Sequence, residues 1–369
     1  SNNVAVGYRA LHVNTTGTQN TAFGTSALAA NTTASENTAV GHNAMAANTT
    51  GAKNVAVGLN ALDGNTTGYR NTTIGYNSQT NSTTGNNNTT CGADTMVSLS
   101  TGHDNTAIGA WALNSNSTGT QNVGVGCSAL KANTTTSGNT AVGYAALATS
   151  TTATGNTAVG AEALTVATGS NNTAVGHDSM KANTSGQGNT ALGMNSLDAN
   201  TTGNYNVALG RDALGANTTG ASNTAVGTNA LDANTTGQLN VAIGYNALTA
   251  QNADAYNTAV GANCMEATTT GSYNAAVGRM ALGSNTTGSY NAAFGYGALD
   301  ANTTGTLNTA VGNNALGANT TASYNTGIGY NALDANTTGA YNTALGADAL
   351  GANTTQSSHT AIGYNALAA

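Results

Sequence analysis

The chain has 369 residues, of which 6% are charged where about a quarter is typical, and its formal net charge is −7. Its seven Lys and Arg residues are well separated, so the sequence offers no basic surface for nucleic acid or anionic lipid. No apolar run reaches the length of a membrane span, and we expect no membrane insertion.

A strict repeat organises this composition, which is otherwise that of a low-complexity tract. Aligned on Asn-Thr-Ala-Val-Gly, units of 17 residues begin at Asn3 and continue to Asn156. After one unit of 16 residues they resume at Asn172 and run to His359, which makes 22 starts. The consensus is N-T-A-V-G-Y-N-A-L-D-A-N-T-T-G-x-x, and its places are numbered 1 to 17 from the first Asn. A register this strict predicts that each unit is one layer of a stack.

Within the unit, two short segments carry the apolar residues. Place 4 is apolar throughout and place 9 is Leu or Met except at Gln79, so we expect these two places to form the core. Places 3 and 8 hold small residues. Place 5 is Gly in every unit, from Gly7 to Gly363, which indicates a positive φ or no room for a Cβ. We therefore predict one strand near T-A-V and a second near N-A-L, joined at this glycine.

The unit is a poor helix, because β-branched residues and two glycines interrupt it and helical repeats are about twice as long. The N-T-T-G segment is typical of a closing turn. We predict an all-β fold, a parallel β-solenoid (β-roll) of about 22 coils with 17 residues per coil. The array is expected to run continuously over residues 1–369 without capping coils, as part of a longer fibre or filament. The Asn residues at place 1 would form a hydrogen-bonded ladder.

The histidines and acidic residues, which could act in catalysis or bind a metal, are not clustered in the sequence. The five histidines lie many coils apart, and the commonest acidic position is place 10, as at Asp63, Asp198 and Asp300. Aspartates one or more coils apart on a surface favour solubility over metal binding. We predict no catalytic residue, no metal site and no cofactor, and hence no enzyme.

Tyrosines form two rows. Those at place 17, just before the Asn, are Tyr205, Tyr256, Tyr273, Tyr290, Tyr324 and Tyr341. Exposed aromatic rows pack against a second chain or stack on sugars, and for a long fibre we favour packing between chains. Candidates for these contacts are the tyrosines at place 6, just after the invariant Gly: Tyr8, Tyr76, Tyr144, Tyr245, Tyr296, Tyr330 and Tyr364.

The N-T-T segment also matches the acceptor sequence for N-glycosylation. One hypothesis is a row of glycans along one edge; the other is that Asn and Thr are simply good turn residues, multiplied by the repeat. Thr hydroxyls in the same turn are alternative sites for O-linked sugars. The candidate glycosylation sites are Asn14, Asn31, Asn48, Asn65, Asn81, Asn116, Asn133, Asn183, Asn200, Asn217, Asn234, Asn285, Asn302, Asn319, Asn336 and Asn353.

Units such as the one at residues 291–305, N-A-A-F-G-Y-G-A-L-D-A-N-T-T-G, resemble repeats of bacteriophage tail fibres and bacterial surface adhesins. The N-T-A-V-G segment is also similar to the head of trimeric autotransporter adhesins, a left-handed parallel β-roll of three chains. This resemblance implies a left-handed coil, a homotrimer, and a location outside the cell, on a cell surface or on a virion. The present unit is longer than that of the adhesin head by its A-N-T-T-G segment.

Three functions remain open on the sequence alone. We expect a structural, non-enzymatic shaft of an extracellular fibre, of the phage tail-fibre or adhesin type. The alternative is a glycan-coated extracellular filament, polymerised end to end from solenoid units. Ice binding is less expected, because the adjacent threonines of the turn point apart on a strand and Thr at place 2 is often replaced by Val or Ala.

Overall fold

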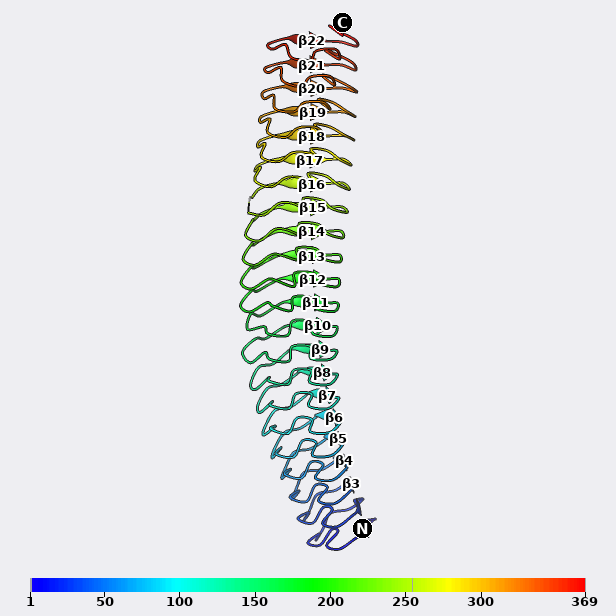
Figure 1. Cartoon of the computed structure of the whole chain (residues 1–369). Coiled ribbons are helices and arrows are strands. Elements are labelled where there is room, and N and C mark those ends of the chain that lie inside the picture. The colour runs from blue at the N-terminus through cyan, green and yellow to red at the C-terminus, as the bar shows by residue number, and fades with distance from the viewer. Residues whose placement is uncertain (1, 254, 369) are drawn as a thin grey trace. The chain divides into compact units, whose positions relative to one another are not determined.

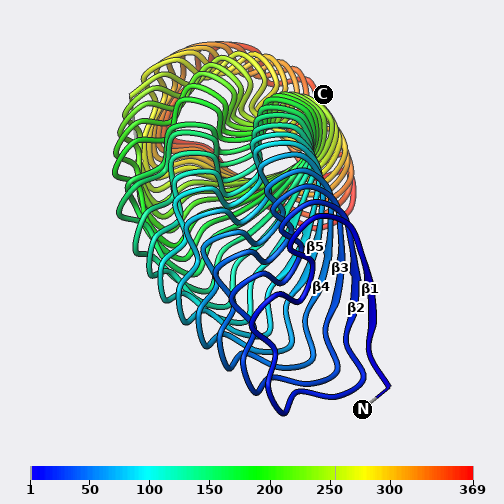
Figure 2. The ribbon, with the colours of Figure 1, turned by 90° about the horizontal axis from the view of Figure 1, so that it is seen from below.

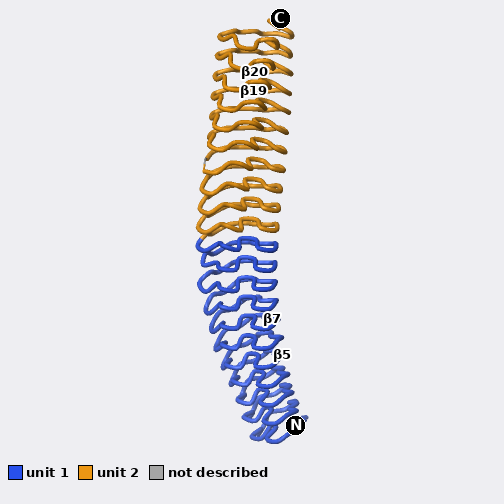
Figure 3. Tube along the Cα trace, viewed as in Figure 1, with its two compact units in different colours: residues 1–185 blue, residues 186–369 orange. Residues whose placement is uncertain are grey.

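The computed structural model describes residues 2–253 and 255–368, and it contains no helix among them. The chain divides into two compact units, Ser1–Ser185 and Gly186–Ala369 (Figure 3), and the continuity of the array over residues 1–369 stays a prediction. Both units are built from the same coil, and each coil contributes one strand of three residues.

The first unit contains the strands β1 (Val4–Val6), β2 (Thr21–Phe23), β3 (Thr38–Val40), β4 (Val55–Val57), β5 (Thr72–Ile74), β6 (Thr89–Cys91), β7 (Thr106–Ile108), β8 (Val123–Val125), β9 (Thr140–Val142), β10 (Thr157–Val159) and β11 (Thr173–Val175). The second unit contains β12 (Thr190–Leu192), β13 (Val207–Leu209), β14 (Thr224–Val226), β15 (Val241–Ile243), β16 (Thr258–Val260), β17 (Ala275–Val277), β18 (Ala292–Phe294), β19 (Thr309–Val311), β20 (Thr326–Ile328), β21 (Thr343–Leu345) and β22 (Thr360–Ile362).

Within each unit, every strand pairs in parallel with the strand of the next coil (Figure 1). The register joins equal places of the repeat: Ala5 lies opposite Ala22, and Ala208 lies opposite Ala225. In Figure 2 the first strands, β1 to β5, lie side by side in chain order. This confirms the predicted all-β parallel solenoid with one coil for each 17-residue repeat.

The core lies at places 3, 8 and 9, which corrects one of the two predicted core places. The small residue at place 3 is buried in every strand except β1, as at Ala39 and Ala242, and Leu or Met at place 9 fills the centre of the coil. The residue at place 4 is buried in none of the 22 strands: Phe23 is 56% exposed and Ile243 is 39% exposed. Side chains alternate between the two faces of a strand. When the alanine at place 3 points inward, the side chains at places 2 and 4 must therefore point outward.

The predicted second strand near N-A-L is wrong. Places 7 and 9 have a left-handed backbone in every coil, as at Ser26 with φ 59° and Leu28 with φ 51°. The N–H of Ser26 donates to Tyr8 of the preceding coil, and the N–H of Leu28 donates to Ala44 of the following coil. This segment therefore hydrogen-bonds to both neighbours without forming a strand. Left-handed φ at Leu costs about 1 to 2 kcal/mol per residue, so this geometry depends on stacking.

A buried polar cluster replaces the apolar core in one coil of the first unit. Gln79 occupies place 9, and its Oε1 accepts a 2.9 Å hydrogen bond from the Thr73 hydroxyl. Its Nε2 donates to Asn71 Oδ1 at 3.4 Å and to Ser82 Oγ at 3.3 Å. The Gln therefore supplies partners to the hydroxyls that replace Ala and Asn around it, and these substitutions are expected to depend on one another.

This dependence predicts the outcome of a double-mutant cycle. Gln79→Leu alone removes the partner of the Thr73 hydroxyl and should lower the free energy of unfolding by about 1 to 3 kcal/mol. Thr73→Ala with Gln79→Leu restores the residues of the other coils and should recover at least about 1 kcal/mol of that loss. Local stability measured by hydrogen exchange in the coils of β4 to β6 tests this, and additive effects would contradict it.

Candidate functional surfaces

Two rows of asparagines lie inside the coil and close it. At place 1, Asn223 donates from Nδ2 to the carbonyl of Gly237 at 2.8 Å across its own coil. Its Oδ1 accepts the N–H of Asn240, the equivalent residue of the next coil, at 3.0 Å. At place 12, the Nδ2 of Asn217 donates to Asn200 Oδ1 at 2.8 Å and to the carbonyl of Gly220 at 3.1 Å. The predicted ladder at place 1 is confirmed, and place 12 forms a second one.

The ladder at place 12 ends where the repeat departs from consensus. Ser82 follows Asn65, and Gln251 follows Asn234. In both runs the last Asn, Asn65 or Asn234, has a buried Oδ1 without a hydrogen-bond partner, because the next coil has no Asn at this place to donate to it. The direction of the ladder, in which each Nδ2 donates to the preceding coil, explains why the unpaired atom is the oxygen.

These contacts bear on the hypothesis of a glycan row at the N-T-T asparagines. A glycan replaces one hydrogen of Nδ2, and these nitrogens are enclosed and already donating, so the folded coil has no room for the sugar. Asn14 is half-buried and makes the same bond to Gly17. Asn81 lies at place 11 and is exposed, so its acceptor sequence stays a prediction. The fourteen buried sites are Asn31, Asn48, Asn65, Asn116, Asn133, Asn183, Asn200, Asn217, Asn234, Asn285, Asn302, Asn319, Asn336 and Asn353.

The outward face of the sheet is uncharged in both units and includes one fully apolar row. Place 4 holds only Val, Ile, Leu, Phe or Cys, and place 2 holds only Thr, Val or Ala. None of these 44 side chains, two from each of 22 strands, is buried. Each unit thus presents two parallel rows of partly exposed side chains, one apolar and one of Thr and Val, at the spacing of neighbouring strands.

The tyrosines at place 6 lie beside this face, just beyond the glycine corner, and they are exposed. Tyr8 is 75% exposed and Tyr296 is 48% exposed, with the guanidinium of Arg279 5.7 Å from the ring centroid of Tyr296. The structure places the predicted candidates on the surface. Whether they contact another chain or a sugar stays a prediction. They are Tyr8, Tyr76, Tyr144, Tyr245, Tyr296, Tyr330 and Tyr364.

The tyrosines at place 17 differ, because in the second unit they occupy consecutive coils. The rings of Tyr256 and Tyr273 are stacked with centroids 4.9 Å apart, and those of Tyr273 and Tyr290 are 5.0 Å apart. Tyr324 and Tyr341 form a further stacked pair at 4.9 Å. Each inner face is covered by the neighbouring ring, which leaves ring edges and hydroxyls exposed and argues against sugar stacking on these faces.

The carboxylates at place 10 pack against glycines. An added Cβ on Gly283 would lie 2.6 Å from Asp300 Oδ1, and one on Gly317 would lie 2.8 Å from Asp334 Oδ1. Partial burial of this kind raises the pKa of Asp300; burial and, secondarily, the charge of Asp348 raise the pKa of Asp334. The glycine on the neighbouring coil explains the position of each aspartate without a ligand.

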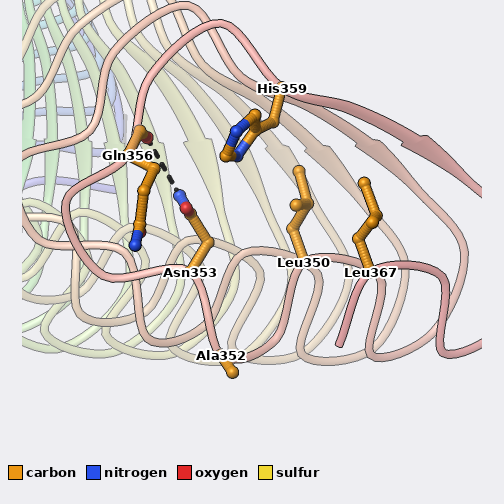
Figure 4. A pocket seen from close by; sticks show the side chains of 6 residues that line it. All are labelled: Leu350, Ala352, Asn353, Gln356, His359 and Leu367. Carbon is orange, nitrogen blue, oxygen red and sulfur yellow. Dashed lines mark hydrogen bonds between the residues drawn. The ribbon is translucent and has the colours of Figure 1, made fainter. Parts of the chain in front are cut away.

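A cavity of about 220 Å³ lies between the coils of β21 and β22 (Figure 4). Asn353 Nδ2 donates to the carbonyl of Gln356 beside it, at 3.2 Å. Most of the lining residues occupy places that point into the coil. In other coils of the unit the next coil covers these places. The cavity is therefore part of the interior of the coil and not a separate binding site. It is lined by Leu350, Ala352, Asn353, Gln356, His359 and Leu367.

Over residues 2–253 and 255–368, no three His, Cys, Asp or Glu side chains come together in a way that would hold a metal ion. The same part of the chain forms no helix long and apolar enough to cross a bilayer. No protein-family model matches this sequence, and no curated protein matches it.

Proposed function

We propose that this chain is a structural, non-enzymatic part of an extracellular fibre, in which copies of the solenoid associate side by side through the outward face of the sheet. The observation that carries the proposal is the uncharged outward face, with an apolar side chain at place 4 and Thr, Val or Ala at place 2, repeated in all 22 coils. Contiguous exposed apolar surface of this extent is typical of an interaction site. A shaft of a phage tail fibre or cell-surface adhesin is the fibre type that the sequence resemblance favours.

The occupant of this face is a second copy of the chain. Every coil contributes one side chain at place 2 and one at place 4 to this face. Two copies aligned coil by coil therefore place equivalent side chains opposite each other along the whole length of a unit. The face carries no charge at places 2 and 4 and is therefore compatible with itself. Burying a whole aliphatic side chain contributes about 1.5 to 3 kcal/mol, so the exposed half of each place-4 side chain adds on the order of 1 kcal/mol per coil. We favour three copies around one axis.

The test replaces three exposed apolar side chains of this face in the second unit: Ile243→Lys, Phe294→Lys and Ile328→Lys in one variant. Each side chain points outward, so the coil should remain folded, while three ammonium groups oppose each other across the interface. We expect sedimentation analysis of the wild type to give an oligomer, with the mass of three chains. The triple variant should associate at least 100-fold more weakly.

A matched control places three lysines elsewhere on the same coils or, for Ile243, on the coil before it. Thr236→Lys, Thr304→Lys and Thr338→Lys change exposed threonines at place 14, away from the sheet face. They add the same charge and should leave the mass unchanged. A wild type that stays monomeric at all concentrations would overturn the proposal, as would equal loss of association in both variants.

The two other functions give distinct outcomes. If the chain forms a glycan-coated filament, natively produced protein should carry the additional mass of the sugars. The enclosed amides of the N-T-T asparagines argue against attachment of sugars in the folded coil. Ice binding predicts thermal hysteresis, and Thr at place 2 does lie on the outward face. However, the Thr row is interrupted by Val or Ala after at most four coils within either unit, as at Val55, Val123 and Ala275. The uninterrupted apolar row at place 4 favours a protein partner.

A further inference from the structure

The stacked tyrosines of the second unit lie at place 17, outside places 2 and 4, through which we propose that copies of the chain associate. Tyr256, Tyr273 and Tyr290 occupy three consecutive coils, with interplanar angles of 7° and 2° between neighbours. Their exposed fractions are 50%, 49% and 57%. Tyr324 and Tyr341 repeat the arrangement with an angle of 9°. Phenol rings are therefore held next to each other, one per coil, with their edges open to solvent.

The other tyrosines have no tyrosine at the same place in an adjacent coil. At place 6, Tyr296 and Tyr330 are 34 residues apart, which is two coils, and Tyr245 is three coils before Tyr296. In the first unit, place 17 holds polar or charged residues and glycine instead, including Glu36 and Lys53, which pair at 3.9 Å. The stacked row is a property of the second unit.

We propose that these stacked tyrosines are a site of oxidative cross-linking, at which a peroxide-driven one-electron oxidant joins adjacent coils through dityrosine. Each of two phenols loses one electron and one proton to give a phenoxyl radical. The radicals couple through a carbon–carbon bond between ring carbons ortho to the oxygens, and the hydrogen on each of these carbons then moves as a proton to the ring oxygen, which restores the hydroxyl and the aromatic ring. One hydrogen peroxide accepts two electrons and two protons and becomes two waters.

Geometry favours coupling within the row. A radical on Tyr273 has a partner ring on either side, at 4.9 and 5.0 Å. Groups held in contact react as if at very high local concentration. The χ2 torsion of Tyr is soft, so the rings can rotate from the stacked arrangement until their ortho edges meet. The exposed edges give the oxidant access, whereas the nearest thiol, Cys264, is fully buried and does not compete.

The consequence of such a bond is mechanical. Solenoid coils are held to their neighbours by hydrogen bonds and packing alone, and they separate by local unstacking. A covalent link between coil n and coil n+1 on the outer surface prevents that separation. Cross-links in this row would therefore make the coils of the second unit more resistant to separation after folding.

The test treats the folded chain with peroxidase and hydrogen peroxide, then digests it with trypsin. In the second unit trypsin cuts after Arg211 and Arg279, giving peptides 212–279 and 280–369. A bond between Tyr273 and Tyr290 joins these two peptides. We expect mass spectrometry to find their summed mass less two hydrogens, with blue dityrosine fluorescence, and with a yield independent of protein concentration.

Two variants separate this row from general tyrosine oxidation. Tyr290→Phe keeps the stack but cannot couple, and it should abolish the joined peptide while dityrosine within each peptide remains. Tyr296→Phe removes a place-6 tyrosine on an adjacent coil and should leave the joined peptide unchanged. A joined peptide that persists in Tyr290→Phe would overturn the proposal. So would its absence from the wild type, or its presence only in covalent dimers.

Discussion

Gly143→Ala is expected to lower the free energy of unfolding of the first unit by at least about 3 kcal/mol. Gly143 is the corner of its coil, with φ 137°, where an alanine is strained by about 1 to 3 kcal/mol. Its added Cβ would also lie 2.4 Å from the carbonyl oxygen and 2.6 Å from the carbonyl carbon of Gly160 in the next coil. That neighbour is backbone held in the stack, so it cannot move without breaking the register.

Gly138, five residues earlier, provides the matched control. Its φ is 72° and an added Cβ would meet no atom within 4 Å, so Gly138→Ala should cost only about 1 kcal/mol, the strain of the left-handed backbone. Thermal unfolding and hydrogen exchange of the coils of β8 to β10 compare the two. Equal losses in both variants would mean that the close contact between glycine corners does not limit the stack.

The architecture was predictable because the repeat is strict. A fixed period with a glycine at place 5 implies stacked equivalent coils, and the structure has them. The assignment of faces was not predictable in the same way. Val at place 4 is more apolar than Ala at place 3, so hydrophobicity alone puts Val inside. The coil interior is narrow, however, and Leu at place 9 already fills it; only a small residue fits beside it, since even a Cβ on Gly327 at place 3 would lie 3.3 Å from Leu316 Cγ of the preceding coil.

The left-handed backbone at place 9 had no signal in the sequence, because Leu disfavours that conformation and stacking imposes it. Place 7 did carry a signal for a left-handed backbone, because it is often Asn or Asp, as at Asn60 and Asp212, and these residues tolerate positive φ. The same turn preference misled at place 12. Asn there was interpreted as a turn residue and a candidate glycosylation site, whereas its amide is enclosed by the coil and bonds to equivalent residues above and below, as at Asn217.

The sequence predicted that the tyrosines form rows, but not that their rings stack on one another. Sequence spacing shows that Tyr256 and Tyr273 are one coil apart, which makes contact predictable once the coil is known. It does not show whether the rings cover each other's faces or present them outward. That difference decides between sugar stacking and ring coupling, and it depends on the side-chain torsions of the folded unit.

The enclosed asparagines of place 1 should be the most sensitive polar residues of the coil. Asn223 is fully buried, and its side chain serves both the Gly237 carbonyl and the N–H of Asn240. Asn223→Ala leaves both groups unpaired, at about 1 to 3 kcal/mol each, so we expect a loss of about 2 to 6 kcal/mol. Asn313→Ala, at an exposed position of the same unit, should change stability by no more than about 0.5 kcal/mol. Thermal unfolding measures both, together with hydrogen exchange of the coils of β13 to β15 for Asn223→Ala and of β18 to β20 for Asn313→Ala.

Asn223→Asp adds a pH dependence that distinguishes a buried hydrogen bond from mere packing. The carboxyl keeps the acceptor for Asn240, but when ionised it opposes the Gly237 carbonyl and has lost its donor. Burial should raise its folded pKa above the unfolded value of about 3.9. A raised folded pKa means that stability is retained below about pH 4 and is lost as pH rises through the folded pKa. The deficit relative to the wild type should therefore be small at pH 3 and large at pH 7. A deficit independent of pH would show that the donor to Gly237 contributes nothing, and that the asparagine is retained for its shape alone.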